Sequence, residues 1–318
     1  MTAKARAASS EVDDFATAVL SGLSSTPKSI PPRYFYDARG SRLFEAITAL
    51  PEYYPTRTEI AILDSAAREI AVASDPRTVL VELGSGSSRK TEMLLAAMPG
   101  LSAYVPIDVS PTALVDASQR LAKRFPRIPV RPVVGDFTRL SALPPEFGDR
   151  PQLGFFPGST IGNFTPAAAK QLLVHWRGLL GRRGRFVVGV DLEKSPRELV
   201  SAYDDAQGVT ADFNLNLLHR INRELDGTFD LARFQHVARW NDRERRIEMH
   251  LVSRAPQEVQ VLGRTIAFAE GESIHTENSY KYTVSRFRTL AEDAGWTPRA
   301  VWLDAAERFS VHELSATQ

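Results

Sequence analysis

Hydrophobic positions recur with helical spacing near the start of the chain. An amphipathic helix is predicted over 11–23 by Val12, Phe15, Val19, Leu20 and Leu23. Repeated prolines between residues 27 and 55 then interrupt the chain, so we expect loops there. The aromatic residues among these prolines either pack on a core or cover a binding site.

Short apolar runs alternate with helical patterns in the middle of the chain. A capping box, Thr56-Arg-Thr-Glu59, predicts a helix that ends near residue 72. Helices are also expected around 90–98, after Ser110-Pro111, and from Thr165-Pro166 to Gly181. Strands are predicted at 78–83, 103–108, 128–134, 153–156 and 184–191. This alternation implies a mostly parallel sheet with helices on both faces.

The pattern changes beyond Ser195-Pro196, which opens another helix. A helix over about 210–225 is followed by strand patterns at 234–241, 245–254, 259–269 and 272–283. The tail then returns to the first pattern, with a helix over 284–294 and strands at 299–303 and 308–314. We therefore expect two domains. A nucleotide-type domain would comprise 57–195 plus 284–318, and an α+β substrate-binding lobe would comprise 1–56 plus 196–283.

Charge and composition exclude several classes of protein. Lys and Arg total 39 and Asp and Glu total 38, which gives a net charge of +1. Proteins that bind nucleic acid or an anionic membrane need a basic surplus, so we expect neither partner. The absence of cysteine excludes disulfides and thiolate catalysis. With no signal-peptide pattern and no apolar run of membrane-spanning length, a cytoplasmic location is expected.

The first predicted strand ends in the most informative segment of the chain. There Glu82-Leu-Gly84-Ser-Gly86 runs into a helix that begins near Lys90. Glycines at this point let the backbone approach a ligand, and the helix start offers free N–H groups. A dinucleotide site would need a third glycine, but that position is Arg89. A cofactor without a pyrophosphate fits better.

Acidic residues end the next two strands. Asp108 lies where such sheets commonly bind a ribose diol, and Asp136 with Phe137 would suit an adenine edge and face. The three strand ends lie side by side at the carboxyl edge of the sheet. Together they resemble the S-adenosylmethionine site of class I, Rossmann-like methyltransferases. The alternative is that each acid only caps a helix or turn.

The fourth predicted strand ends in a glycine-rich loop, Gly158-Ser-Thr-Ile-Gly162-Asn163. In class I methyltransferases this edge faces the transferable methyl group. The Asn/Asp-Pro-Pro-aromatic motif of enzymes that methylate base amino groups is absent here. Asn163 would suit a small polar acceptor, or else serve as a turn residue that tolerates left-handed backbone.

Six strings of sequence carry a more specific resemblance that covers nearly the whole chain. They are Pro31-Pro-Arg-Tyr-Phe-Tyr-Asp37, Leu50-Pro-Glu-Tyr-Tyr-Pro-Thr-Arg-Thr-Glu59, Val81-Glu-Leu-Gly-Ser-Gly86, Gly158-Ser-Thr-Ile-Gly-Asn163, Ala202-Tyr-Asp-Asp205 and Thr276-Glu-Asn-Ser-Tyr-Lys281. The set resembles the histidine Nα-methyltransferase family, the first enzyme of ergothioneine biosynthesis. Family members convert L-histidine to its trimethylated betaine, hercynine, and consume three S-adenosylmethionine molecules.

The resemblance implies a role for individual residues. Asn163 would hold the α-amino group of histidine, Tyr36 and Tyr203 its carboxylate, and Glu277 and Ser279 its imidazole. The residues implied to contact the cofactor are Tyr53, Gly84, Lys90, Asp108, Asp136 and Phe137. Gly86 completes the glycine loop beside Gly84 and is assigned to the same cofactor site. The implied cosubstrate is S-adenosylmethionine and the implied partner is L-histidine. We expect a monomer.

The spacing of Glu277 and Ser279 agrees with this role. They are two residues apart in a strand pattern, so their side chains share a face. A carboxylate and a hydroxyl together can bind both ring nitrogens of an imidazole. The alternative is an exposed strand face, which is the usual place for Glu and Ser.

No metal is expected from the six histidines. His236 and His250 would lie opposite each other if their strands paired about a turn near Arg243, but no third ligand is evident.

Methyl transfer depends mainly on orientation, so Asn163 and Tyr53 are expected to position the reactants, with no strong base. Two alternatives are a methyltransferase of this fold for another amino acid or a protein, and a non-catalytic S-adenosylmethionine-binding module.

Overall fold

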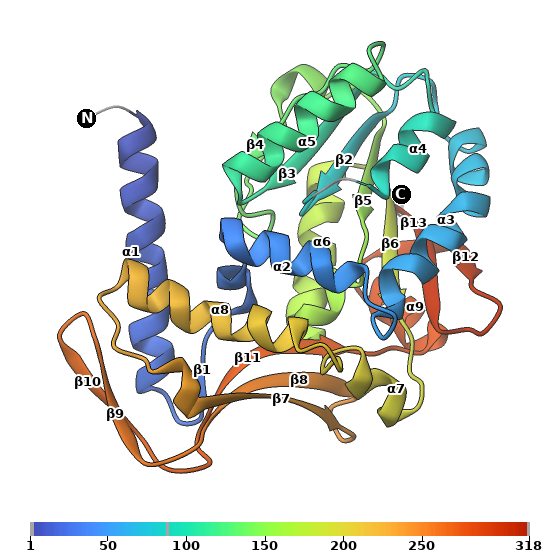
Figure 1. Ribbon diagram of the computed structural model, residues 1–318. Helices are drawn as coiled ribbons and strands as arrows, with labels where there is room; N and C mark the ends of the chain where they lie inside the picture. Colours follow the sequence, from blue (N-terminus) through green and yellow to red (C-terminus); the bar gives the residue numbers. More distant parts are fainter. Residues whose placement is uncertain (1–2, 87–88, 317–318) are drawn as a thin grey trace. The chain divides into compact units, whose positions relative to one another are not determined.

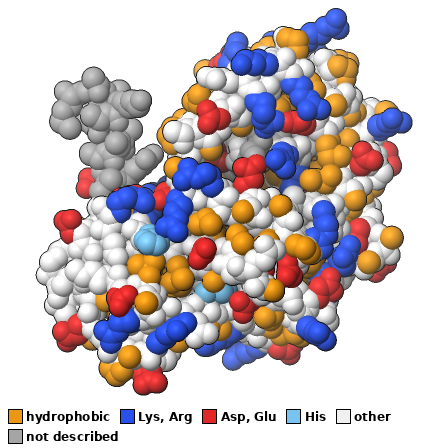
Figure 2. Space-filling view, viewed as in Figure 1, with side chains coloured by type: hydrophobic (Ala, Val, Ile, Leu, Met, Phe, Trp, Pro, Cys, Tyr) orange, Lys and Arg blue, Asp and Glu red, His pale blue; other side chains and the backbone are white. Residues whose placement is uncertain are grey.

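The computed structural model describes residues 3–86 and 89–316 (Figure 1). The chain forms two compact units. The four-strand unit comprises Met1–Tyr53 and Ser195–Asn278, and the seven-strand unit comprises Tyr54–Lys194 and Ser279–Gln318. Lys and Arg side chains are interspersed with Asp and Glu on the face shown in Figure 2, in keeping with the net charge of +1.

The seven-strand unit is built on a mostly parallel sheet with the strand order β12-β13-β6-β5-β2-β3-β4. The parallel strands are β2 (Val79–Leu83), β3 (Ala103–Asp108), β4 (Val133–Val134), β5 (Gln152–Phe156) and β6 (Arg185–Asp191). The antiparallel strands are β12 (Trp296–Leu303) and β13 (Phe309–Ala316). The predicted parallel sheet is therefore confirmed, with an antiparallel pair at one edge.

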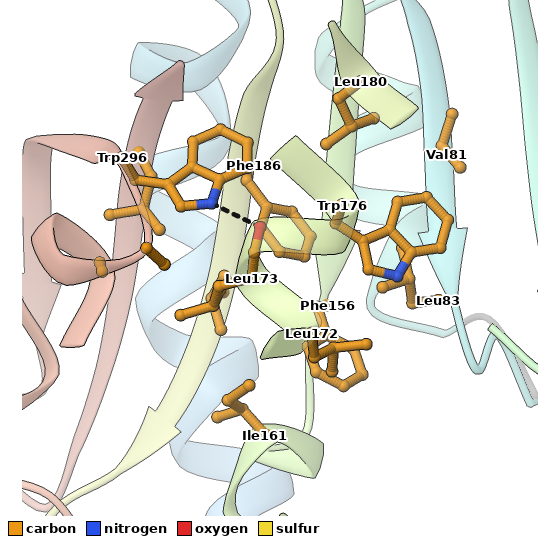
Figure 3. Close-up of a cluster of buried hydrophobic side chains, with 14 of the residues drawn as sticks. Val81, Leu83, Phe156, Ile161, Leu172, Leu173, Trp176, Leu180, Phe186 and Trp296 are labelled. Carbon is orange, nitrogen blue, oxygen red and sulfur yellow. Dashed lines mark hydrogen bonds between the residues drawn. The ribbon is translucent and has the colours of Figure 1, made fainter. Parts of the chain in front are cut away.

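Helices cover both faces of this sheet, as predicted. They are α3 (Tyr54–Val72), α4 (Thr91–Ala97), α5 (Pro111–Arg124), α6 (Pro166–Leu180) and α9 (Val284–Asp293). Alternate residues of β2 enter different cores: Val81 packs with α6 and α9, and Leu80 with α3, α4 and α5. In the first core, shown in Figure 3, the Trp296 indole N–H donates to the carbonyl oxygen of Leu173 over 2.9 Å.

Side-chain caps begin three helices where the sequence predicts them. Ser110, Thr165 and Ser195 each accept a hydrogen bond from the backbone N–H three residues later, and proline follows each of them. A hydroxyl at the cap replaces a missing backbone acceptor, and proline at the first helical position loses no hydrogen bond. Such starts are local, which is why they can be predicted from sequence.

Two expectations for the seven-strand unit are wrong. The helix predicted from Thr56 begins at Tyr54, and Glu59 binds Lys90 and Gly158 instead of closing a capping box. The strand predicted over 128–134 shrinks to the two residues of β4, with one isolated bridge from Val130 to Tyr104. Pro129 and Pro132 interrupt this segment, because proline cannot donate to a strand ladder.

The four-strand unit packs helices on an antiparallel sheet with one short parallel strand. Its sheet has the order β1-β11-β8-β7, and a separate hairpin joins β9 to β10. The strands are β1 (Lys28–Ser29), β7 (Phe234–Asn241), β8 (Arg246–Ser253), β9 (Gln257–Val261), β10 (Arg264–Phe268) and β11 (Ser273–Tyr280). The helices are α1 (Ala3–Ser24), α2 (Ala38–Thr48), α7 (Pro196–Ser201) and α8 (Val209–Glu224). Within the described ranges, no helix has the length and apolar character needed to cross a membrane.

Three sequence expectations for this unit need correction. Helix α2 lies where loops are expected, and Asp37 caps it by accepting from the Gly40 N–H. The single strand expected over 259–269 is a hairpin instead, because Leu262 and Gly263 adopt positive φ angles of 48° and 75° and form a two-residue turn. Helix α1 also begins at Ala3, earlier than expected.

Candidate functional site

The glycine loop after β2 joins the acid that ends β3. Gly84 and Gly86 have φ angles of 66° and 47°, which favour glycine. The Gly86 N–H donates to Asp108 Oδ2 over 2.8 Å, and the Ser110 N–H donates to Asp108 Oδ1 over 2.9 Å. Burial raises the pKa of Asp108, although these N–H groups lower it. The carboxylate is thus held in place at the carboxyl edge of the sheet.

Phe137 lies beside the same loop. A Cβ atom built on Gly84 would be 3.5 Å from the Phe137 ring, so that ring flanks the glycine backbone. Phe137 also packs edge-on against Phe156, with ring centroids 5.3 Å apart. Asp136 accepts from the Thr138 N–H and hydroxyl, so it stabilises the turn that presents Phe137. The structure therefore brings these predicted cofactor residues to one edge.

Glu59 links Lys90, another predicted cofactor residue, to the acceptor loop. Its side chain is fully buried, and its Oε2 accepts from Lys90 Nζ over 2.5 Å and from the Gly158 N–H over 2.8 Å. A single carboxylate of α3 thereby holds the loops that follow β2 and β5. Sequence reasoning assigned Glu59 only to a capping box, and the long-range contact has no local signal.

The acceptor loop has a strained start. Ser159 adopts φ 56°, and its hydroxyl accepts from the Asp191 N–H over 2.9 Å. A Cβ atom on Gly162 would lie 2.7 Å from the Tyr280 carbonyl oxygen, so only glycine fits there. Asn163 ends the short 3-10 helix η3 (Thr160–Asn163) and is half-buried. It does not have a positive φ, so the left-handed turn role considered for it is wrong.

A buried acid near the end of β2 joins this strand to α4 and β3. Glu82 is fully buried and accepts from the Thr91 and Tyr104 hydroxyls. Burial raises its pKa to about 7, although both hydrogen bonds lower it. Neither hydroxyl partner was predicted from sequence, because each lies on a different element.

Glu82 makes stability depend on pH. Its pKa is raised in the folded state, so its contribution is fully present below the unfolded pKa and is lost as pH rises through about 7. Between the unfolded pKa of 4.5 and the folded pKa of about 7, we expect the ionisation of Glu82 to lower the free energy of unfolding by about 3 kcal/mol. In Glu82→Gln the fall should be smaller by that amount, as measured by urea unfolding at a series of pH values. Equal pH dependence in both proteins would show that Glu82 does not titrate in this range.

A second buried network surrounds the end of β6. Asp191 accepts from Tyr54, Lys194 and Lys281 at 2.6–2.9 Å. Burial alone would raise the pKa of Asp191, but the two lysines hold it below its usual range. Lys281 also donates to Ser279 Oγ over 2.7 Å. The predicted imidazole ligand Ser279 is thus held in place by a buried lysine that sequence reasoning did not single out.

The three predicted tyrosines of the four-strand unit share one aromatic cluster. The Tyr53 and Tyr203 rings are 6.2 Å apart, and Tyr36 and Tyr53 both pack on Phe44 at 5.6 and 6.3 Å. Phe213 of α8 completes the cluster. Phe44 lies on α2, the helix that the sequence pattern did not predict. Its role could not be recognised without the fold.

Glu277 and Ser279 both lie on β11. They are 9 % and 2 % exposed, so the alternative of an exposed strand face is wrong. The Glu277 carbonyl oxygen lies 3.0 Å from His275 Nε2.

The predicted pairing of His236 and His250 is wrong. His236 pairs with Leu251, and Val237 pairs with His250, because the turn spans 242–245. A shift of one residue places the two imidazoles on opposite faces of the sheet. His236 faces α8, where its Nδ1 is 2.8 Å from Asn214 Nδ2, and its Nε2 contacts the Tyr203 carbonyl oxygen.

Comparisons with known proteins show the family to which the chain belongs. The family described as "Histidine-specific methyltransferase, SAM-dependent" matches residues 15–316. The chain is 44% identical over 310 residues to the histidine N-alpha-methyltransferase of Mycolicibacterium smegmatis, with 96% of each chain covered. It is 28% identical over 298 residues to ergothioneine biosynthesis protein 1 of Neurospora crassa, covering 92% of this chain and 34% of that one.

A solved structure supports the fold. The CcbJ methyltransferase of Streptomyces caelestis is 16% identical and superposes with a TM-score of 0.50, covering 89% of this chain and 100% of that one. The predicted α/β fold of the class I methyltransferases is confirmed.

Proposed function

We propose that this chain, which belongs to the family of SAM-dependent, histidine-specific methyltransferases, methylates the α-amino group of L-histidine. The observation that carries the proposal is 44% identity to a histidine N-alpha-methyltransferase over 96% of both chains. We further propose that three methyl groups are added to give hercynine. A relative named for ergothioneine biosynthesis supports a place at the start of that pathway.

The seven-strand unit offers groups that fit S-adenosylmethionine. We assign Asp108 to the ribose hydroxyls, since a carboxylate held by N–H groups retains oxygen lone pairs for a diol. Asp136 and Phe137 are assigned to the adenine, and the Lys90 ammonium to the anionic end of the cofactor. Gly84 and Gly86 let the backbone approach it. Bound S-adenosylmethionine supplies an electrophilic methyl group on a sulfonium.

The acceptor residues would orient a neutral amine. We assign Asn163 to the α-amino group, Tyr36 and Tyr203 to the carboxylate, and Glu277 and Ser279 to the imidazole; Tyr53 positions the reactants. A peptide α-amino group has a pKa of about 8, and the positive charge of a nearby sulfonium lowers the pKa of an amine. The amine therefore loses its proton near neutral pH without a strong base. Orientation then provides most of the rate acceleration.

The product of histidine tests this proposal. The protein should convert histidine with S-adenosylmethionine into a product heavier by three methyl groups, as measured by mass spectrometry. Methylation of another amino acid or of a protein, with no histidine product, would support a different substrate on the same fold. Cofactor binding with no turnover of any amine would support a non-catalytic binding module.

The assignment of Asp108 predicts a loss of cofactor affinity. In Asp108→Ala the ribose would lose charge-assisted hydrogen bonds worth about 1.5–3 kcal/mol, or roughly ten- to a hundredfold in affinity. Calorimetric titration with S-adenosylhomocysteine measures the effect. The exposed Asp116 of α5 provides the matched control, Asp116→Ala, which should bind normally. Unchanged affinity in Asp108→Ala would remove this residue from the site.

A further inference from the structure

Three metal-ligating side chains gather on one face of the four-stranded sheet. Glu248 and His250 alternate along β8 and so share a face. His275 lies on β11, the neighbouring strand. One possible ligand atom from each residue lies within 4.8 Å of the other two. The adjacent Thr276 points the other way, because its hydroxyl donates to Asn214 of α8.

We propose that Glu248, His250 and His275 form a binding site for a divalent transition-metal ion, with Zn²⁺ as the expected occupant, built from side chains that are assigned neither to the substrate nor to the cofactor. Two imidazoles and one carboxylate are a common donor set for Zn²⁺. His250 Nε2 and Glu248 Oε2 are already 3.2 Å apart. In a tetrahedral Zn²⁺ site with metal–ligand distances of about 2.0–2.1 Å, two ligand atoms lie about 3.3 Å apart, which is close to the observed spacing.

The second ring nitrogen of each histidine has an oxygen partner, as in known metal sites. His275 Nε2 lies 3.0 Å from the Glu277 carbonyl oxygen. Since a carbonyl oxygen only accepts, Nε2 carries the proton and Nδ1 keeps its lone pair. His250 Nδ1 lies 3.2 Å from Ser273 Oγ. Because a carboxylate only accepts, His250 Nε2 carries the proton while it contacts Glu248 Oε2. The Ser273 hydroxyl can accept as well as donate, so the proton can move to Nδ1 and leave Nε2 for the ion.

The rings are also arranged for a shared ligand. The His250 and His275 imidazoles are nearly parallel, with centroids 4.7 Å apart and an interplanar angle of 18°. Two such rings on adjacent strands can direct one nitrogen each toward the same side. The side chains of His250 and Glu248 are 11% and 14% exposed, so both side chains contact solvent.

Charges around the cluster set the expected strength of binding. Arg246 and Asn241 donate to Glu248 Oε1, which leaves Oε2 toward His250. Arg239 lies opposite Glu248 in the strand register. Two nearby guanidinium groups weaken cation binding, so we expect an exchangeable ion instead of one required for folding.

Zinc titration tests the proposal directly. Tag-free protein, dialysed against a chelator, should take up one equivalent of Zn²⁺ in competition with a chromogenic chelator. Glu248→Gln and His275→Ala should each weaken Zn²⁺ binding by at least about tenfold. Loss of a group that only hydrogen-bonds to a metal ligand already lowers metal affinity by about this factor. The matched control is His219→Ala, which removes an exposed imidazole from α8 and should bind normally.

Thermal unfolding provides an independent measurement. An ion that binds only the folded state raises the melting temperature. Zn²⁺ should therefore stabilise the native protein and His219→Ala, but not Glu248→Gln, which keeps the volume of the side chain. Methylation of histidine should persist in chelator-treated protein. No stoichiometric uptake, or equal uptake by all variants, would overturn the site; loss of methylation on chelation would overturn its separation from catalysis.

Discussion

Glu277→Ala is expected to lower kcat/KM for L-histidine by about 30- to 150-fold. The carboxylate is proposed to accept from the imidazole N–H, and a charge-assisted hydrogen bond in a buried site is worth about 2–3 kcal/mol. Glu277 is 9 % exposed, so water would not readily replace the lost oxygen. The measurement is kcat/KM for histidine in both proteins under saturating S-adenosylmethionine.

Relative specificity should change as well. A site that hydrogen-bonds a ring rejects apolar analogues, because its own polar atoms are then left unpaired. Removing the carboxylate removes that penalty, so the ratio of histidine to phenylalanine turnover should fall. The control is Glu258→Ala, since Glu258 is an exposed carboxylate on β9. An unaltered ratio in Glu277→Ala would place this residue outside the substrate site.

Glu59→Ala should have the largest effect on stability. The substitution leaves the Lys90 ammonium, whose side chain is 15% exposed, without its ion-pair partner and the Gly158 N–H without its acceptor. Removing one partner of a buried ion pair costs about 3–5 kcal/mol. Urea unfolding should therefore show a loss of this size. Asp64→Ala, at an exposed position of the same helix, should change stability little.

A milder variant separates stability from binding. Glu59→Gln retains an oxygen that can accept from the Gly158 N–H but loses the charge that holds Lys90. We expect it to fold and to bind S-adenosylhomocysteine more weakly than the native protein. Native affinity in folded Glu59→Gln would show that the ion pair stabilises the fold without positioning Lys90 for the cofactor.

The order of elements follows from local sequence. Apolar runs of strand length alternate with amphipathic stretches, and Ser110, Thr165 and Ser195 begin helices through caps that involve only their own neighbours. The carboxyl edge of a parallel sheet then places Gly84 and Asp108 together without further information. For this reason the cofactor edge could be predicted. The substrate residues depended on resemblance, because spacing alone favoured an exposed strand face for Glu277 and Ser279.

Tertiary structure decided what depends on residues far apart in the chain. Glu59 binds Lys90 and Gly158 across 31 and 99 positions, so local sequence could only suggest a capping box. The register of β7 and β8 depends on the length of the turn between them. A shift of one residue in this register changes whether His236 and His250 lie on the same face of the sheet or on opposite faces. His275 joins Glu248 and His250 only because β11 lies beside β8. Sequence by itself determined the periodic and capped elements, whereas long-range pairing decided which polar side chains meet, since periodicity carries no information about strand neighbours.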